Sequence, residues 1–277
     1  MEISIPVSLG IDLKVADRLN RLDEYATSSL PKGFRMASDG NELVEEAVGF
    51  GFPVLKRGLQ TLFPGKVELM FEQHGSAWSV RTVFHLNLVE KIHQAGSGSI
   101  ENDLVYATKN SLAAAIRHFP PIRGLLTFFS SGLRKTFGWK TAYEQTDFCA
   151  EITMIHRIQA GTGKVEVEMD TTDLPASVTE VIVMNEQGAH YFDQYLDSSG
   201  ISLHGKKIGC WDLVTAQEAS FISTSHRVTF RLNRVKGARL FRGRELVGSR
   251  LAWAGFGYSF PPSIKKFVYD LDIERLM

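Results

Sequence analysis

The strongest constraint on the fold is an alternation of apolar and polar residues that recurs along most of the chain. The clearest example lies between residues 78 and 88, where one face carries Trp78, Val80, Phe84, Leu86 and Leu88. Residues 148–158 and 165–169 alternate in the same way on either side of a glycine-containing turn at 161–163. A period of two residues is typical of β-strands with one buried face. The chain is therefore predicted to be mainly β, with antiparallel hairpins.

The second half of the chain continues this pattern in shorter segments. Further strands are expected near 178–184, 190–196, 213–222, 226–232, 238–247, 251–258 and 266–273. Strands do not alternate with helices, which favours antiparallel sheets stacked as a sandwich. We predict one β-rich domain spanning residues 1–277, built as a large antiparallel β-sandwich. The alternative is a pair of lipocalin-like barrels, one in each half of the chain.

One segment departs from the strand pattern. Between residues 103 and 138 apolar residues recur at helical spacing, and Pro120-Pro121 divides the stretch in two. We expect an inserted helical pair at about 103–138 that packs on the sheet. The basic polar side of residues 121–138 raises the alternative of contact with a membrane surface.

Composition excludes some functions. The 277 residues carry a formal net charge of zero, which argues against a surface that attracts nucleic acid as a whole. The two cysteines, Cys149 and Cys210, are too few for a disulfide framework, and the first residues lack a signal-peptide pattern, so a cytoplasmic protein is expected. The histidines and cysteines show no metal-ligand spacing and no cofactor motif is present, so neither a metal nor a cofactor is expected.

Glu245 is the first candidate for chemistry. If residues 239–247 form a strand, Glu245 shares a face with Phe241 and Val247, while Arg242 and Arg244 lie on the other face. A carboxylate among apolar residues must pair with a cation, or its pKa rises toward the range that a general acid or base needs. The alternative is a structural ion pair with one of the neighbouring arginines.

His190 is the second candidate, because it follows a glycine and an alanine at a strand start and precedes Tyr191, Phe192 and Asp193. The stretch from Asn185 to Gly200, with His190-Tyr191-Phe192 at its centre, resembles a segment of the galactose mutarotase-like sugar epimerases. The resemblance implies a β-supersandwich fold, with a histidine as general acid and a C-terminal glutamate as general base at the anomeric centre of a sugar.

Two functions remain open. The first is binding or modification of a small carbohydrate, with His190, Glu245 and Asp193 as the catalytic groups. The residues expected to bind the sugar are Glu186, Tyr191, Trp211, Arg242, Arg244 and Trp253. The second is binding of an apolar, terpenoid-like or lipid ligand, or its conversion by a cyclase- or hydratase-type enzyme. That ligand would contact Phe128, Phe129 and Phe137.

Overall fold

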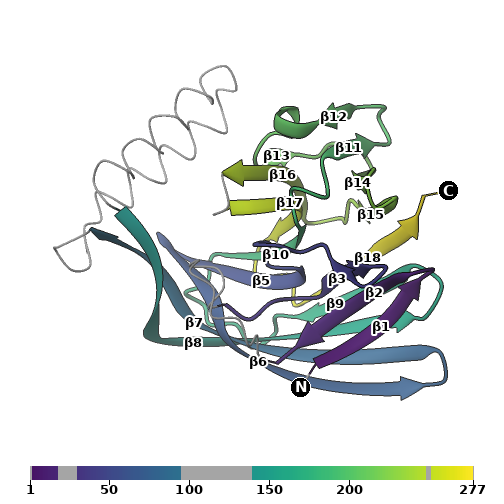
Figure 1. Ribbon diagram of the computed structural model, residues 1–277. Helices are drawn as coiled ribbons and strands as arrows, with labels where there is room; N and C mark the ends of the chain where they lie inside the picture. The colour runs from purple at the N-terminus through teal and green to yellow at the C-terminus, as the bar shows by residue number, and fades with distance from the viewer. Residues whose placement is uncertain (1, 18–29, 95–138, 248–250, 277) are drawn as a thin grey trace.

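The part of the chain that the structure describes consists mainly of β-strands (Figure 1). The computed structural model describes residues 2–17, 30–94, 139–247 and 251–276. Within these ranges the helical structure is one short 3-10 turn, η3 (Gly205–Ile208). The inserted helical pair predicted at about 103–138 lies outside the described residues.

The N-terminal residues form a small four-stranded sheet. Its strands are β1 (Glu2–Ser8), β2 (Ile11–Ala16), β3 (Arg35–Ser38) and β4 (Asn41–Glu42), paired in that order. Residues at alternate positions of β1 are buried, as the period-two pattern requires. These buried side chains belong to the same hydrophobic cluster as those of the larger sheet, so the small sheet packs against the large one.

The remaining strands form one sheet of 14 strands in the order β12-β11-β14-β15-β18-β9-β8-β7-β6-β5-β10-β17-β16-β13. Its first members in the chain are β5 (Phe50–Arg57), β6 (Gln60–His74), β7 (Ala77–Gln94), β8 (Trp139–Gln159), β9 (Lys164–Asp170) and β10 (Glu180–Gln187). The others are β11 (Gln194–Asp197), β12 (Ser202–His204), β13 (Asp212–Leu213), β14 (Glu218–Ser223), β15 (Val228–Asn233), β16 (Arg239–Val247), β17 (Leu251–Phe260) and β18 (Lys266–Arg275).

The large sheet curves so that its two arms face each other. Phe256 on β17 lies 4.9 Å from Phe221 on β14 and 5.9 Å from Phe230 on β15, measured between ring centroids. Offset and edge-on contacts of this kind are the favoured geometry for buried aromatic rings. The arm β11-β14-β15-β18 therefore packs on the arm β10-β17-β16, and their side chains form the centre of the main core.

This arrangement confirms the predicted mainly antiparallel β-sandwich, since neighbouring strands of both sheets pair antiparallel. The alternative of two lipocalin-like barrels is wrong, because strands from both halves of the chain belong to one continuous sheet. The halves are joined at two places: β7 pairs with β8, with Phe84 opposite Ile152, and β5 pairs with β10, with Met184 opposite Phe52. Each half therefore completes the sheet of the other.

The register of β10, β17 and β16 sorts their side chains onto two faces. Glu186 lies opposite Gly255, and Gly255 lies opposite Gly243. Glu245 lies opposite Trp253, two residues along from this row. Because side chains alternate across a strand, these residues share one face, and Phe256 belongs to the other, which is the core. We call the first one the carboxyl face: Glu186, Gly243, Glu245, Trp253, Gly255 and Gly257.

Candidate functional site

Two tryptophans lie on the carboxyl face. The rings of Trp211 and Trp253 are stacked, with centroids 4.7 Å apart and planes inclined by 20°. Trp253 is buried, whereas Trp211 is half-buried and forms the outer member of the pair. Trp211 has a φ of 58°, a conformation that bulky residues rarely adopt. Strained residues of this kind concentrate at functional sites, which makes the tryptophan pair a candidate ligand platform.

Two glycines make room for the tryptophan pair. A Cβ atom at Gly243 would come within 2.6 Å of the Trp253 ring, and one at Gly257 would come within 2.9 Å of the Trp211 ring. Gly243 also lies against the Trp211 backbone. Any larger residue would therefore prevent the rings from lying flat on β16 and β17. The close approach of the rings thus accounts for glycine at positions 243 and 257, whereas Gly255 lies against the backbone of Asn185 and Glu186.

Glu186 is a buried carboxyl group beside the tryptophan pair, with 4 % of its surface exposed. Burial raises the pKa of Glu186 to about 7, and the nearby negative charge of Glu245 adds to the rise. The Val48 N–H, 3.5 Å from Glu186 Oε2, and the Lys32 ammonium both oppose it. Glu186 therefore exchanges its proton close to neutral pH, which suits a general acid or base.

Glu245 lies on the face of β16 that also carries Phe241, as the sequence predicted, and its side chain is half-buried. The Cys210 thiol lies 4.0 Å from Glu245 Oε2, at the limit of a hydrogen bond to sulfur. The two carboxyl groups are close enough for the charge of Glu245 to raise the pKa of Glu186. A pair of interacting carboxyl groups in which one holds a proton and the other does not is the usual arrangement for acid–base work.

The loop of residues 43–48 covers this part of the sheet. Val44 and Ala47 pack on Trp253 in a small cluster separate from the main core. The Gly188 N–H donates to the Leu43 carbonyl at 2.6 Å, which fixes the start of the loop to the end of β10. The Glu186 N–H donates to the Gly49 carbonyl at 3.1 Å, which fixes its end. Loop 43–48 thus shields Glu186 and Trp253 from solvent.

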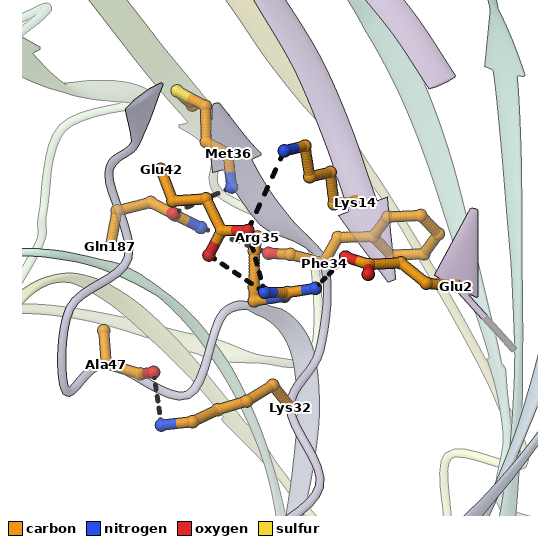
Figure 2. Close-up of polar contacts among 9 residues, drawn as sticks. All are labelled: Glu2, Lys14, Lys32, Phe34, Arg35, Met36, Glu42, Ala47 and Gln187. Atoms are coloured by element: carbon orange, nitrogen blue, oxygen red, sulfur yellow. Dashed lines mark hydrogen bonds and ion pairs between the residues drawn. The ribbon is translucent and has the colours of Figure 1, made fainter. Parts of the chain in front are cut away.

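Side chains from β3 and β10 hold this loop in place (Figure 2). Gln187 accepts the Met36 N–H at 3.1 Å and donates to the Phe34 carbonyl at 3.2 Å, so β10 is tied to β3 through a buried side chain. Arg35 pairs with Glu42 at 2.9 Å and also with Glu2. β3 is therefore tied both to β10 and to β4, the strand from which loop 43–48 starts.

His190 lies beside loop 43–48 and is about half exposed. Its Nδ1 lies 2.6 Å from Glu45 Oε1, and its backbone N–H donates to Glu45 Oε2 at 3.2 Å. Glu45 has a φ of 47°, so the residue that receives His190 is itself in an uncommon conformation. His190 and Glu186 therefore contact the same loop, His190 at Glu45 and Glu186 at Val48. The convergence of His190 with Glu245 remains a prediction.

Arg242 and Arg244 lie on the face of β16 opposite to Glu245, as strand alternation requires. Arg244 donates to the carbonyls of Ala189 at 2.7 Å and Phe192 at 3.2 Å. Burial lowers the pKa of Arg244, and the negative charges of Asp193 and Glu45 oppose this. Asp193 and Arg244 therefore support the loop that follows β10.

Arg242 and Tyr191 have structural neighbours of their own. The Arg242 guanidinium lies 4.5 Å from the centre of the Tyr195 ring and donates to the Ile208 carbonyl at 3.2 Å. The Tyr191 ring packs edge-on against His226 at 5.1 Å. The structure therefore gathers Glu186, Glu245, Trp211 and Trp253 on one face, and places the contacts of Arg242, Arg244, Tyr191 and Asp193 elsewhere.

Sequence reasoning missed two residues of this site. Lys32 is buried beside loop 43–48, although Pro31-Lys32-Gly33 has the composition of an exposed turn. Glu45 lies in a stretch without periodicity, so no pattern pointed to it. The signal for Lys32 was its position between Pro31 and Gly33 immediately before an apolar strand, where a long side chain can reach back under the neighbouring loop.

Two features are absent from the described part of the chain. No group of three or more histidine, cysteine, aspartate or glutamate side chains is arranged to hold a metal ion there. None of the helical structure described is long and apolar enough to cross a membrane.

Comparison with known proteins gives likeness in fold only. No protein-family model and no curated protein sequence matches the chain. An alpha-N-acetylgalactosaminidase, NagBb from Bifidobacterium bifidum, superposes with a TM-score of 0.50 and 11 % identity over 99 % of this chain and 36 % of that one. A galactose mutarotase-like protein from Lactobacillus casei gives a TM-score of 0.42 and 10 % identity over 99 % of each chain.

The chain thus spans about a third of the length of the Bifidobacterium protein. At this identity the likeness shows a shared fold and nothing about activity. The resemblance to galactose mutarotase-like proteins that the sequence suggested is confirmed as a weak structural similarity. The solved structures with this fold include proteins whose names refer to carbohydrates.

Proposed function

We propose that this protein binds a small carbohydrate on the carboxyl face and that Glu186 and Glu245 exchange protons with it. The observation that carries the proposal is the stacked pair Trp211–Trp253 beside a buried carboxyl group with a pKa of about 7. Aromatic rings supply flat apolar surface for the C–H groups of a sugar, while carboxyl groups accept and donate its hydrogen bonds. This combination suits a ligand with both kinds of surface.

The roles of the two carboxyl groups follow from their surroundings. Glu186, with the raised pKa, holds its proton below neutral pH and is the acid that donates to a sugar oxygen once loop 43–48, which covers it, moves aside. Glu245 is more exposed and is the base that accepts a proton from a sugar hydroxyl. The roles reverse on return, so the pair supports reactions such as anomer interconversion. This assignment replaces His190 by Glu186 as the acid, because His190 is paired with Glu45.

Binding can be tested by titrating the protein with a panel of monosaccharides and disaccharides while following tryptophan fluorescence. We expect Trp211→Ala to weaken binding at least tenfold, because it removes the outer ring of the platform. Trp78→Phe is the matched control, since Trp78 contacts Phe71 at the β6–β7 hairpin rather than the carboxyl face. Equal binding by wild type and Trp211→Ala would contradict the proposal.

The acid–base role can be tested separately by polarimetry on a freshly dissolved sugar that binds. Glu186→Gln preserves shape and removes the exchangeable proton, so we expect the catalysed rate to fall by about two orders of magnitude. Binding should change far less. A Glu186→Gln protein that keeps the wild-type rate would leave sugar binding intact as a function and exclude the acid role of Glu186.

A second ligand class is favoured by one observation. The face that carries Glu186 continues into a cluster of apolar residues in which Ile182, Met184, Phe63, Leu88 and Tyr143 are only partly buried. An apolar or lipid-like ligand would be expected to contact these residues. A fluorescence competition experiment tests whether a fatty acid binds on this face. Displacement of a bound sugar by the fatty acid would show that both ligands use the carboxyl face. The residues Phe128, Phe129 and Phe137 predicted for this ligand lie outside the described residues.

A further inference from the structure

We infer that Lys32 is a positioning residue, which holds loop 43–48 against Trp253 and Glu186 in the arrangement that the carboxyl face needs. The inference rests on the proposed function, because it assigns a role within the same site. Lys32 lies in the segment before β3, is 6 % exposed and was not expected to take part. A buried ammonium group must be compensated by acceptors or by an opposite charge, and its neighbours show which.

The contacts of Lys32 are to the backbone of the loop itself. Its Nζ donates to the Ala47 carbonyl at 2.8 Å (Figure 2). It also donates to the Glu46 carbonyl at 3.4 Å. Ala47 in turn packs on the side chain of Trp253. The ammonium group therefore holds the stretch of backbone that supports the inner tryptophan of the pair.

The segment that carries Lys32 is itself fixed to the end of the loop. The Gly33 N–H donates to the Val48 carbonyl at 2.8 Å, and a Cβ atom at Gly33 would lie 2.0 Å from the Phe50 carbonyl oxygen. Phe34 and Phe50 form a bridge in the next position. This close contact fixes the backbone next to Lys32. The Lys32 side chain therefore extends under the loop from a backbone position that cannot move freely.

The charge of Lys32 also acts on Glu186. The charged groups that act on Glu186 from the surrounding elements are Lys32 before β3 and Glu245 on β16, while Glu186 itself helps to raise the pKa of Tyr143 on β8. Of these, the Lys32 ammonium lowers the pKa of Glu186, while the charge of Glu245 raises it. Lys32 therefore keeps the ionised form of Glu186 accessible near neutral pH, although burial disfavours that form.

The experiment compares Lys32→Met with the control Lys14→Met in the protein without ligand. Lys14 is a partly buried lysine on β2 that faces Glu42 at 3.8 Å, so its loss removes a cation without touching loop 43–48. The titration of Glu186 is followed by carbon NMR of glutamate side chains, assigned with Glu186→Gln. We expect Lys32→Met to raise the titration midpoint of Glu186 by about one pH unit and Lys14→Met to leave it unchanged. Lys32→Arg, which keeps the charge, should restore most of the shift.

An unchanged midpoint in Lys32→Met, or an equal shift in Lys14→Met, would overturn the inference. If Lys32→Met does not fold, Lys32→Arg decides, because it keeps a cation beside the Ala47 and Glu46 carbonyls. A folded Lys32→Arg with the wild-type titration midpoint of Glu186 supports the inference, and a midpoint raised by about one pH unit despite the retained cation overturns it. These measurements need no sugar, so failure of the wild type to bind sugars would refute the proposed function while the role of Lys32 is decided on its own.

Discussion

The two faces of β10, β17 and β16 are built on different principles although they belong to the same strands. On the core face Phe256 contacts Phe221 and Phe230, and all three rings are fully buried. On the carboxyl face the same strand β17 carries glycines at 255 and 257, and the space above them holds tryptophans and carboxyl groups. The core face buries apolar rings against one another. The carboxyl face instead contains a strained backbone at Trp211 and the desolvated carboxyl group of Glu186. Arrangements that lower stability persist where function requires them.

The main core and the carboxyl face both contain buried titratable groups, and burial shifts the pKa values of His156 and Glu186 in opposite directions. His156 on β8 is buried in the main core against Phe34, and burial lowers its pKa to about 3, with only slight opposition from the Val80 backbone. Glu186 is buried on the carboxyl face, and burial raises its pKa to about 7. Desolvation favours the neutral form in both cases. His156 is consequently silent near neutral pH, whereas Glu186 titrates there.

The largest expected difference between the faces is in stability. Phe256→Ala removes a ring at the centre of the core and should cost about 3–5 kcal/mol in the free energy of unfolding. Trp211→Ala removes a ring that is only half-buried, so less apolar burial is lost, and the strain at φ 58° stays because alanine keeps the Cβ atom. Urea denaturation of the two variants provides the comparison. If Trp211→Ala were the more destabilising, the carboxyl face would be a second core and not a ligand surface.

The next largest effect is the acid sensitivity of the core face. The unfolded chain protonates His156 near pH 6.5, but the folded protein does so only near pH 3. Between these values the unfolded state binds more protons, so stability should fall as the pH falls, by up to about 1.4 kcal/mol per pH unit. His156→Leu should remove this part of the pH dependence. The measurement is urea denaturation at pH 6 and pH 4.5, and an equal acid dependence in both proteins would contradict the burial of an uncharged histidine.

The carboxyl face should respond to pH with the opposite sign and over a narrower window. The folded protein keeps the Glu186 proton up to about pH 7, whereas the unfolded chain loses it near pH 4.5. The folded state therefore binds more protons in this interval, and stability should fall as the pH rises, by about 3 kcal/mol at most across the window. Glu186→Gln should flatten the curve. A stability that rises between pH 5 and pH 7 in the wild type and not in Glu186→Gln would reverse the sign and refute the assignment.

The sequence contained most of the fold because strand patterns are local. Alternation placed β9 and β16 close to their observed bounds and found one part each of β7 and β8, which extend on to Gln94 and back to Trp139; it also assigned Glu245 and Arg244 to opposite faces of β16 correctly. Burial follows from such alternation whenever one face of a sheet meets a core. Pairing across the sheet is not local, and the meeting of β5 with β10 could not be read from either segment alone.

The site was less accessible to sequence reasoning because its parts come from distant segments. The sequence led us to expect that Glu186 would contact the substrate. It did not indicate that the pKa of Glu186 would be raised, because the burial of this side chain depends on loop 43–48. Lys32 and Glu45 lie in that neighbourhood and have no periodic signature. His190 was singled out for its sequence neighbours, yet its partner Glu45 is 145 residues away. Charges in folded proteins acquire their properties from such long-range contacts.

The smallest expected effect on stability, and the sharpest probe of the carboxyl face, is Gly257→Ala. The added methyl group would meet the edge of the Trp211 ring at 2.9 Å, and the next nearest atoms lie at 3.6 Å or more. A side chain can move where a backbone atom cannot, so the ring should tilt away from Trp253 at a cost of about 1 kcal/mol. The stacked pair should produce an exciton couplet in the far-ultraviolet circular dichroism spectrum, which Gly257→Ala should weaken and Trp78→Phe should leave intact. A couplet that survives Gly257→Ala while sugar binding is lost would show that the methyl group blocks the ligand directly, and that the ligand reaches the strand itself between the two rings.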